Sequence, residues 1–132
     1  MAVKNQMCSM EHVESWIAEA AIEKYDAVKL GTVEGQLLKS ASANDVVIGF
    51  ALNDAAIGTS VDIQRDGTAR ARCSAAILLG ASVMATADGE VVTVAASSNV
   101  QYHCIGQAAS ATGAANEILS VVINPHSNYT HA

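Results

Sequence analysis

The sequence is poor in aromatic side chains. One Trp, one Phe and three Tyr make up 4% of the 132 residues, although 51% of the chain is hydrophobic. The apolar residues are therefore mostly Ala, Val and Ile, which bury little area each at about 25 cal/mol per Å². A single copy would have a thin core, so we expect subunits to associate and bury further surface.

Basic residues are also scarce. The chain has 7 Lys and Arg against 13 Asp and Glu, which gives a formal net charge of −6. Nucleic-acid binding requires clustered basic side chains. Arg65, Arg70 and Arg72 are close in sequence, but Asp62 and Asp66 lie among them, which is typical of a solvated strand face. We expect no nucleic-acid partner.

Long hydrophobic runs are missing. The longest wholly apolar run is Ala75–Leu79, whereas a membrane helix needs about 20 residues. The N-terminus has no apolar segment followed by a small-residue cleavage site, as a secretory signal would. We therefore expect no membrane partner and synthesis in the cytoplasm.

The three cysteines, Cys8, Cys73 and Cys104, form no CxxC pair. Zinc ribbons and redox motifs need such pairs, so we interpret these residues as reduced thiols. The sequence predicts no metal site.

Catalytic motifs are similarly absent. The sequence has no P-loop, no GxGxxG and no GxSxG turn. The one hydrolase hypothesis combines His103 with Asp54 or Asp88, because triads assemble from distant positions. Without a nucleophile motif beside these residues, the sequence predicts no enzymatic activity.

Two similar β segments are present. Val46–Ile63 reads as an apolar strand, a polar corner and a returning strand. Ile105–Ile123 repeats this order more loosely. Gly49 and Gly106 lie inside the first strand of each segment, 57 positions apart. A strand-interior Gly marks a bulge or a close backbone approach, so we expect a shared bend.

Turn signals divide the rest of the chain into short strands. We predict hairpins around Gly31–Gly35, at Asp66-Gly67 and at Asp88-Gly89, and we expect Pro125 to end any strand pairing. About eight to ten short strands with turns every 8 to 12 residues are typical of an all-β sandwich or barrel.

The N-terminal part supports two readings. Spacings of three and four residues favour a helix over about Met10–Ala21, with Val13, Trp16, Ile17, Ala20 and Ala21 on its apolar face. The alternative is a strand with Trp16, Ala18 and Ala20 on one face. We divide the chain into an N-terminal arm or short helix (1–20), a β-rich domain (21–124) and a polar C-terminal tail (125–132).

Over about Ala21–Asn124 the chain resembles the capsid decoration, or cement, proteins of tailed bacteriophages. The resemblance is in the order and spacing of several short motifs: Ala27-Val28-Lys29-Leu30, Ile48-Gly49-Phe50-Ala51, Asp54-Ala55-Ala56-Ile57-Gly58, Val61-Asp62-Ile63, Leu79-Gly80-Ala81-Ser82-Val83, Asp88-Gly89-Glu90-Val91, Ile105-Gly106-Gln107-Ala108 and Val121-Val122-Ile123.

The resemblance implies a non-enzymatic, cofactor-free virion protein that binds the major capsid protein on the outer surface of an assembled icosahedral capsid and stabilises it. It implies a homotrimer, with a dimer as the alternative, and an extended N-terminal segment. Because the arm lies outside the repeated segments, we expect it to supply capsid-binding residues: Ala2, Val3, Lys4, Asn5, Gln6, Met7 and Met10.

A second hypothesis is a virion-displayed β-barrel module that binds glycan or a host surface. It rests on Trp16, Tyr102 and Tyr129 as stacking groups. Carbohydrate sites usually cluster their aromatic side chains, whereas these three are scattered along the sequence.

Overall fold

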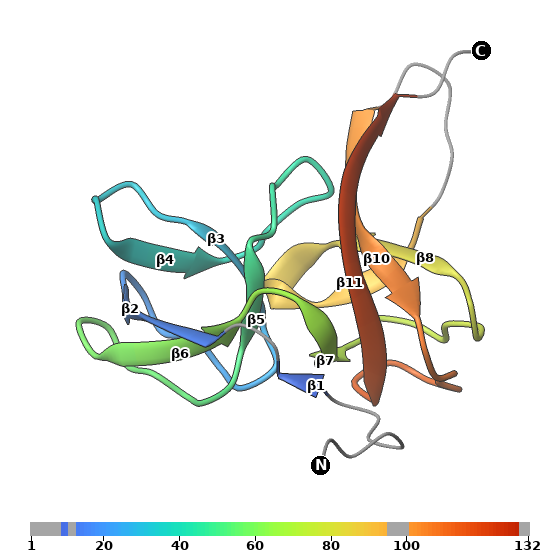
Figure 1. The fold of residues 1–132 in the computed structure, drawn as a ribbon, viewed down its shortest axis with the longest axis horizontal. Helices are drawn as coiled ribbons and strands as arrows, with labels where there is room; N and C mark the ends of the chain where they lie inside the picture. The colour runs from blue at the N-terminus through green and yellow to red at the C-terminus, as the bar shows by residue number, and fades with distance from the viewer. Residues whose placement is uncertain (1–8, 11–12, 95–100, 130–132) are drawn as a thin grey trace.

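The computed structural model describes residues 9–10, 13–94 and 101–129, and these form a barrel beside a six-stranded sheet (Figure 1). The predicted all-β class is confirmed. The strands of the described residues are β1 (Ser9–Met10), β2 (Val13–Ala18), β3 (Ala27–Leu30), β4 (Gln36–Lys39), β5 (Gly49–Ala51), β6 (Ser60–Gln64), β7 (Gly67–Arg72), β8 (Ser82–Ala85), β9 (Val91–Thr93), β10 (Gln101–Ala108) and β11 (Ile118–Tyr129). One 3-10 turn, η1 (Ala87–Gly89), precedes β9.

Strands β2 to β6 form the closed barrel, which we call unit 1. Their order is β2-β4-β3-β5-β6, and the barrel closes because β2 pairs with β6 as well as with β4. Alternate side chains point inward, as in β6, where Val61 and Ile63 are fully buried and Asp62 between them is not. The interior is filled by Ala18, Ile22, Val28, Leu37, Ala51, Ala55, Val61 and Ile63.

The helix expected over Met10–Ala21 is wrong, because Val13–Ala18 form strand β2. Trp16 pairs with Val61 of β6, and Ile17 pairs with both Ser60 of β6 and Gln36 of β4. Burial alternates so that Trp16 and Ala18 share the inner face, as in the strand alternative. Pairing on both edges thus outweighs the helical spacing of the apolar residues, as tertiary context often does.

Strands β7 to β11, which we call unit 2, repeat the arrangement of unit 1 strand by strand. The sheet order is β1-β7-β11-β10-β8-β9. Strands β7, β8, β9, β10 and β11 correspond to β2, β3, β4, β5 and β6, and four of the five strand pairings of unit 1, all except β2–β4, have a counterpart in this sheet. The two ends of this sheet also meet, because Cys73, directly after β7, forms a parallel bridge with Val91 of β9. Unit 2 is therefore a second, less completely closed barrel.

The hydrogen bonds outside the strands repeat as well. Tyr25 N–H donates to the Ala51 carbonyl at 2.8 Å, and Gly80 N–H donates to the Ala108 carbonyl at 2.8 Å. The isolated bridge Ile22↔Ala55 has its counterpart in Ile77↔Thr112. The similarity of Val46–Ile63 and Ile105–Ile123 in the sequence is thus part of a duplication that covers both units.

The predicted close approach at Gly49 and Gly106 is confirmed. Gly49 pairs with Val28 and Gly106 pairs with Val83, which are equivalent positions of the two units. A Cβ atom on Gly49 would meet the carbonyl oxygen of Gln64 at 2.5 Å, and one on Gly106 would clash with the Val122 carbonyl. Both glycines are therefore required by backbone crowding.

The hairpins at Gly31–Gly35 and Asp88-Gly89 are confirmed, since β3 pairs with β4 and β8 pairs with β9. The hairpin at Asp66-Gly67 is wrong: this turn leads from β6 in the barrel to β7 in the sheet. Gln64 Nε2 donates to the carbonyls of Asp66 and Thr68, at 2.8 and 3.0 Å, and so holds the turn that joins the two units.

Pro125 does not end the pairing of its strand. The β10–β11 register continues beyond it, with Cys104 opposite His126 and Gln101 opposite Tyr129. The register shifts between Cys104 and Gly106, which places Pro125 in a β-bulge. A bulge accommodates Pro because a ladder hydrogen bond is not needed there.

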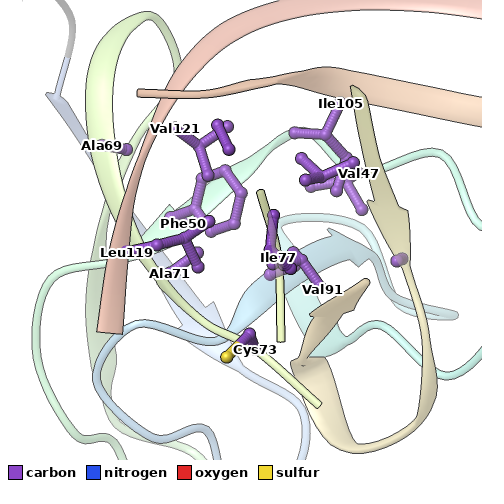
Figure 2. Packing of buried hydrophobic residues seen from close by; sticks show 14 residues of the cluster. Val47, Phe50, Ala69, Ala71, Cys73, Ile77, Val91, Ile105, Leu119 and Val121 are labelled. Atoms are coloured by element: carbon purple, nitrogen blue, oxygen red, sulfur yellow. The ribbon is translucent and has the colours of Figure 1, made fainter. Parts of the chain in front are cut away.

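The core of unit 2 includes side chains from unit 1. Ala27, Val47 and Phe50 belong to the same buried cluster as Ala71 and Leu119. Phe50 points out of its own barrel, and Figure 2 shows its ring beside Val121, Leu119 and Ala71. Because Phe50 is only 1% exposed, the two units share one continuous hydrophobic contact.

Candidate functional site

A buried polar network joins the two units beside the shared core. Asp26, directly before β3, is fully buried, and its Oδ1 accepts a hydrogen bond from Arg72 Nη2 of β7 at 2.6 Å. Its Oδ2 accepts from the backbone N–H of Glu23 at 2.9 Å. Arg72 also pairs with Glu90 at 3.4 Å and Glu23 at 3.5 Å. This network fixes unit 1 against unit 2.

Burial raises the pKa of Asp26, although the hydrogen bonds from Glu23 and Arg72 act in the opposite direction. The guanidinium of Arg72 is also partly buried, but its hydrogen bond with Asp26 raises the Arg72 pKa above its usual value. The pKa shift of Arg72 therefore comes from the ion pair at the junction, whereas the pKa shift of Asp26 comes from burial. We assign these residues a structural role.

An open pocket of about 290 Å³ lies on unit 1, beside β2 and the β3–β4 turn. It is lined by Trp16, Leu30 and residues 31–36. Leu30 is 59% exposed and Val33 is 50% exposed, while Trp16 is half-buried and donates from Nε1 to Glu14 at 3.0 Å. The pocket therefore combines exposed apolar side chains with polar residues of the turn.

The turn before β8 exposes two leucines of unit 2. Leu78 is 78% exposed and Leu79 is 69% exposed, the first and third largest values among the exposed large hydrophobic residues of the described chain. The equivalent turn of unit 1 carries the charged residues Glu23 and Lys24 instead. Because the same turn forms with charged residues, its geometry does not require leucines. Exposed apolar residues of this kind indicate an interaction surface.

The capsid-binding residues expected in the arm are only partly within the described structure. Ala2, Val3, Lys4, Asn5, Gln6 and Met7 lie outside the described residues. Met10 lies in β1, where its backbone pairs with Gly67 of β7. This pairing places the start of the described chain at the β7 edge of the six-stranded sheet (Figure 1).

The residues of the hydrolase hypothesis lie on three different elements. His103 is half-buried in β10, Asp54 lies in the corner between β5 and β6, and Asp88 lies in η1. Asp54 Oδ1 accepts the backbone N–H of Lys24 at 2.8 Å, and Asp88 pairs with Lys39 at 3.6 Å. The described contacts of both carboxylates are structural.

Other predicted features can be placed in part. Cys73 and Cys104 are free and buried, as expected of reduced thiols, whereas Cys8 lies outside the described residues. Within the part of the chain that the structure describes, no group of three or more His, Cys, Asp or Glu side chains could hold a metal ion. Over the same residues, no helix has the length and apolar character needed to cross a membrane.

One of the three aromatic residues of the glycan hypothesis lies at a pocket. Trp16 lines the pocket on unit 1, while the side chains of Tyr102 and Tyr129 lie outside the described part of β10 and β11.

The sequence did not predict the pocket or the exposed leucines. The run Ala75–Leu79 carried a signal for the leucines, but only the comparison of the two units distinguishes them from core residues.

Comparison with known proteins gives a matching family and a similar solved structure. Residues 9–124 match the model of a family described as phage cement protein. A solved structure described as the head fiber gp8.5 N base in bacteriophage phi29 is similar, with a TM-score of 0.69 and 16% sequence identity. The match covers 86% of this chain and 93% of that chain. At this identity the likeness shows a shared fold. No curated protein sequence matches the chain.

Proposed function

Because the chain belongs to the phage cement protein family, we propose that it binds the outer surface of an assembled icosahedral capsid and stabilises it without catalysing a reaction. Its role is structural and associated with a phage capsid. The proposed partner is the major capsid protein, and the proposed location is the capsid exterior. The observation that carries the proposal is the family match over residues 9–124.

The exposed leucines supply a concrete contact surface for this function. Leu78 and Leu79 lie together at one tip of unit 2, and burying an exposed Leu side chain contributes about 1.5–3 kcal/mol. The adjacent segment 113–118 is also exposed, so a flat partner surface can approach the leucines. We propose that this tip, defined by Leu78 and Leu79, contacts the major capsid protein.

The N-terminal arm is the second proposed contact. Its residues 2–7 precede β1, which pairs with β7 at the edge of unit 2. An arm that starts from this edge can extend over a neighbouring capsid subunit while the barrel units stay folded. The test deletes residues 2–7 and keeps β1; we expect weaker capsid binding with unchanged thermal stability. Unchanged affinity would refute the contribution of the arm.

Association of copies fits the same function. A homotrimer, our proposed assembly, presents three tips at once, so weak single contacts combine into tight binding. The net charge of −6 favours solubility of the protein before it meets the capsid.

Thermal disruption of capsids tests the proposed function. Purified protein is added to expanded, undecorated capsids of the phage that encodes it, and capsid disruption is followed by light scattering during heating. We expect the disruption temperature to rise with added protein up to saturation of the capsid sites. A disruption temperature that does not change at saturating protein would contradict stabilisation.

A further inference from the structure

The pocket on unit 1 corresponds, through the duplication, to a surface of unit 2 that residues of unit 1 cover. In unit 2 this surface, which we call the seat, is formed by Ala71, Arg72, Ala85 and the turn 86–90. Unit 1 occupies it: Asp26 binds Arg72, the Ser40 carbonyl accepts the N–H of Gly89 at 2.9 Å, and Phe50 lies beside Ala71 (Figure 2).

The strand pairings identify the same seat on unit 1. Trp16 pairs with Val61 as Ala71 pairs with Leu119, and Leu30 pairs with Leu37 as Ala85 pairs with Val91. The seat of unit 1 therefore consists of Trp16, Ile17, Leu30 and the turn 31–36. Except for Ile17, these are the residues that line the pocket.

Two equivalent glycines show that one seat is filled and the other is open. Gly35 and Gly89 lie in the equivalent β-turns and both have positive φ, 80° and 72°. A Cβ atom on Gly89 would meet the Asp26 carboxylate carbon at 2.7 Å, whereas one on Gly35 would meet nothing within 4 Å. The seat of unit 1 thus has space where the seat of unit 2 holds a neighbour.

The chain also carries a second copy of the face that fills the seat. The filling residues of unit 1, Asp26, Ala27, Ser40 and Phe50, correspond through the duplication to Ala81, Ser82, Val94 and Gln107 of unit 2. Gln107 is exposed, and Ala81, Ser82 and Val94 are half-buried. We call these four residues the plug face of unit 2.

We propose that the plug face of one copy docks into the unit 1 seat of a second copy, repeating between chains the contact that joins the two units within the chain. This proposal deepens the proposed association of copies, and it does not depend on capsid binding. The occupant is a second copy because the same chain bears both halves of a contact that it already makes internally.

The sequence differences between the two contacts are mutually compatible. Within the chain, the charged pair Arg72 and Asp26 meets; between chains, the equivalent pair is the apolar Ile17 and Ala81. Likewise, the small Ala71 receives the large Phe50 within the chain, whereas the large Trp16 would face the smaller Gln107. The charge on the seat and the charge on the plug face are thus lost together, which avoids an unpaired charge. In the second pair the larger side chain lies on the seat instead of on the plug face.

Seat and plug face are different surfaces, so the proposed contact is heterologous. A heterologous contact gives a ring when its rotation closes. Each copy would use one seat and one plug face.

The test combines one seat variant with one plug variant. Leu30→Glu places a charge in the seat, and Gln107→Glu places one on the plug face; both positions are exposed, so both variants should fold. We expect each variant alone to be monomeric by sedimentation equilibrium at concentrations at which the wild-type protein is oligomeric. Leu79→Glu, equally exposed but outside both surfaces, is the control and should keep the wild-type mass.

Mixing the two variants gives the decisive result. The Leu30→Glu copy retains a normal plug face, and the Gln107→Glu copy retains a normal seat, so an equimolar mixture should form dimers through one intact contact. A monomeric wild-type protein, variants that keep the wild-type mass, or a mixture that stays monomeric would overturn the proposal. Capsid binding by a protein that fails these tests would leave the proposed function standing.

Discussion

The carboxylate of Asp26 in unit 1 lies 2.6 Å from the guanidinium of Arg72 in unit 2, so one ion pair fixes the two halves of the chain against each other. Asp26 is completely buried. Removing one member of a buried pair leaves the other charge without compensation, which costs more than the pair itself contributes.

Replacing Arg72 should therefore destabilise the protein strongly. We expect Arg72→Ala to lower the free energy of unfolding by about 3 kcal/mol, the lower end of the range for breaking a buried pair, because Arg72 is only partly buried. Chemical denaturation measures this. Arg70→Ala is the matched control: it lies on the exposed side of the same strand and should change stability by less than about 0.5 kcal/mol.

The pH dependence of stability should differ in sign between two aspartates. Burial raises the pKa of Asp26 in the folded protein, so its contribution to stability is present below the pKa of the unfolded chain and is lost as pH rises through the folded pKa. Asp45 is also partly buried, but hydrogen bonds from Ala41, Lys29 and Ser42 outweigh this and lower its pKa. Its contribution is present above the unfolded pKa and is lost as pH falls through the folded pKa.

Urea unfolding between the acid range and neutral pH measures both effects. Asp26→Asn should remove a loss of stability that the wild-type protein shows as pH rises above the usual aspartate pKa. Asp45→Asn should remove a loss that the wild-type protein shows as pH falls below it. Parallel pH profiles for wild type and both variants would contradict these assignments.

The shared core predicts that the two units unfold together. Phe50 belongs to unit 1 but is buried against unit 2, so Phe50→Ala should cost about 3–5 kcal/mol. The lost contacts belong to both units, and the unfolding transition should stay single. Val46→Ala, at an exposed position four residues earlier, should be close to neutral. Two separate transitions in the wild-type protein would show that the units are independent.

The exposed leucine pair should affect capsid binding without affecting the fold. The double variant Leu78→Ser, Leu79→Ser removes apolar surface from the tip of unit 2, and we expect at least a tenfold loss of affinity for undecorated capsids with an unchanged unfolding midpoint. Ile57→Ser is the control, because Ile57 is 71% exposed but lies in unit 1. Equal affinities of the double variant and the control would place the contact elsewhere.

The strands with strong local signals could be predicted from the sequence. Asp88-Gly89 and Gly31–Gly35 mark hairpins whose strands pair, and Gly49 and Gly106 mark equivalent crowded positions. These features depend on neighbours in sequence or on backbone space, both of which leave a trace in residue type. The corner segments of the two units were visible for the same reason.

Features that depend on distant pairing could not be predicted. Trp16 and Ile17 have helical spacing, and only the edges of β4 and β6 make their segment a strand. Asp66-Gly67 has the residues of a hairpin, but its strands find partners in different sheets. Nothing near Asp26 in the sequence indicates Arg72, which is 46 positions away, so the junction of the two units had no local signal.

Capsid binding by the unmodified protein tests the central claim most directly. Purified wild-type protein is mixed with expanded, undecorated capsids, the capsids are sedimented, and bound protein is quantified over a range of concentrations. The family assignment and the exposed tip of unit 2 predict saturable binding with a fixed number of copies per capsid. Absence of the protein from the capsid pellet at all concentrations would contradict the claim that it is a capsid-binding cement protein.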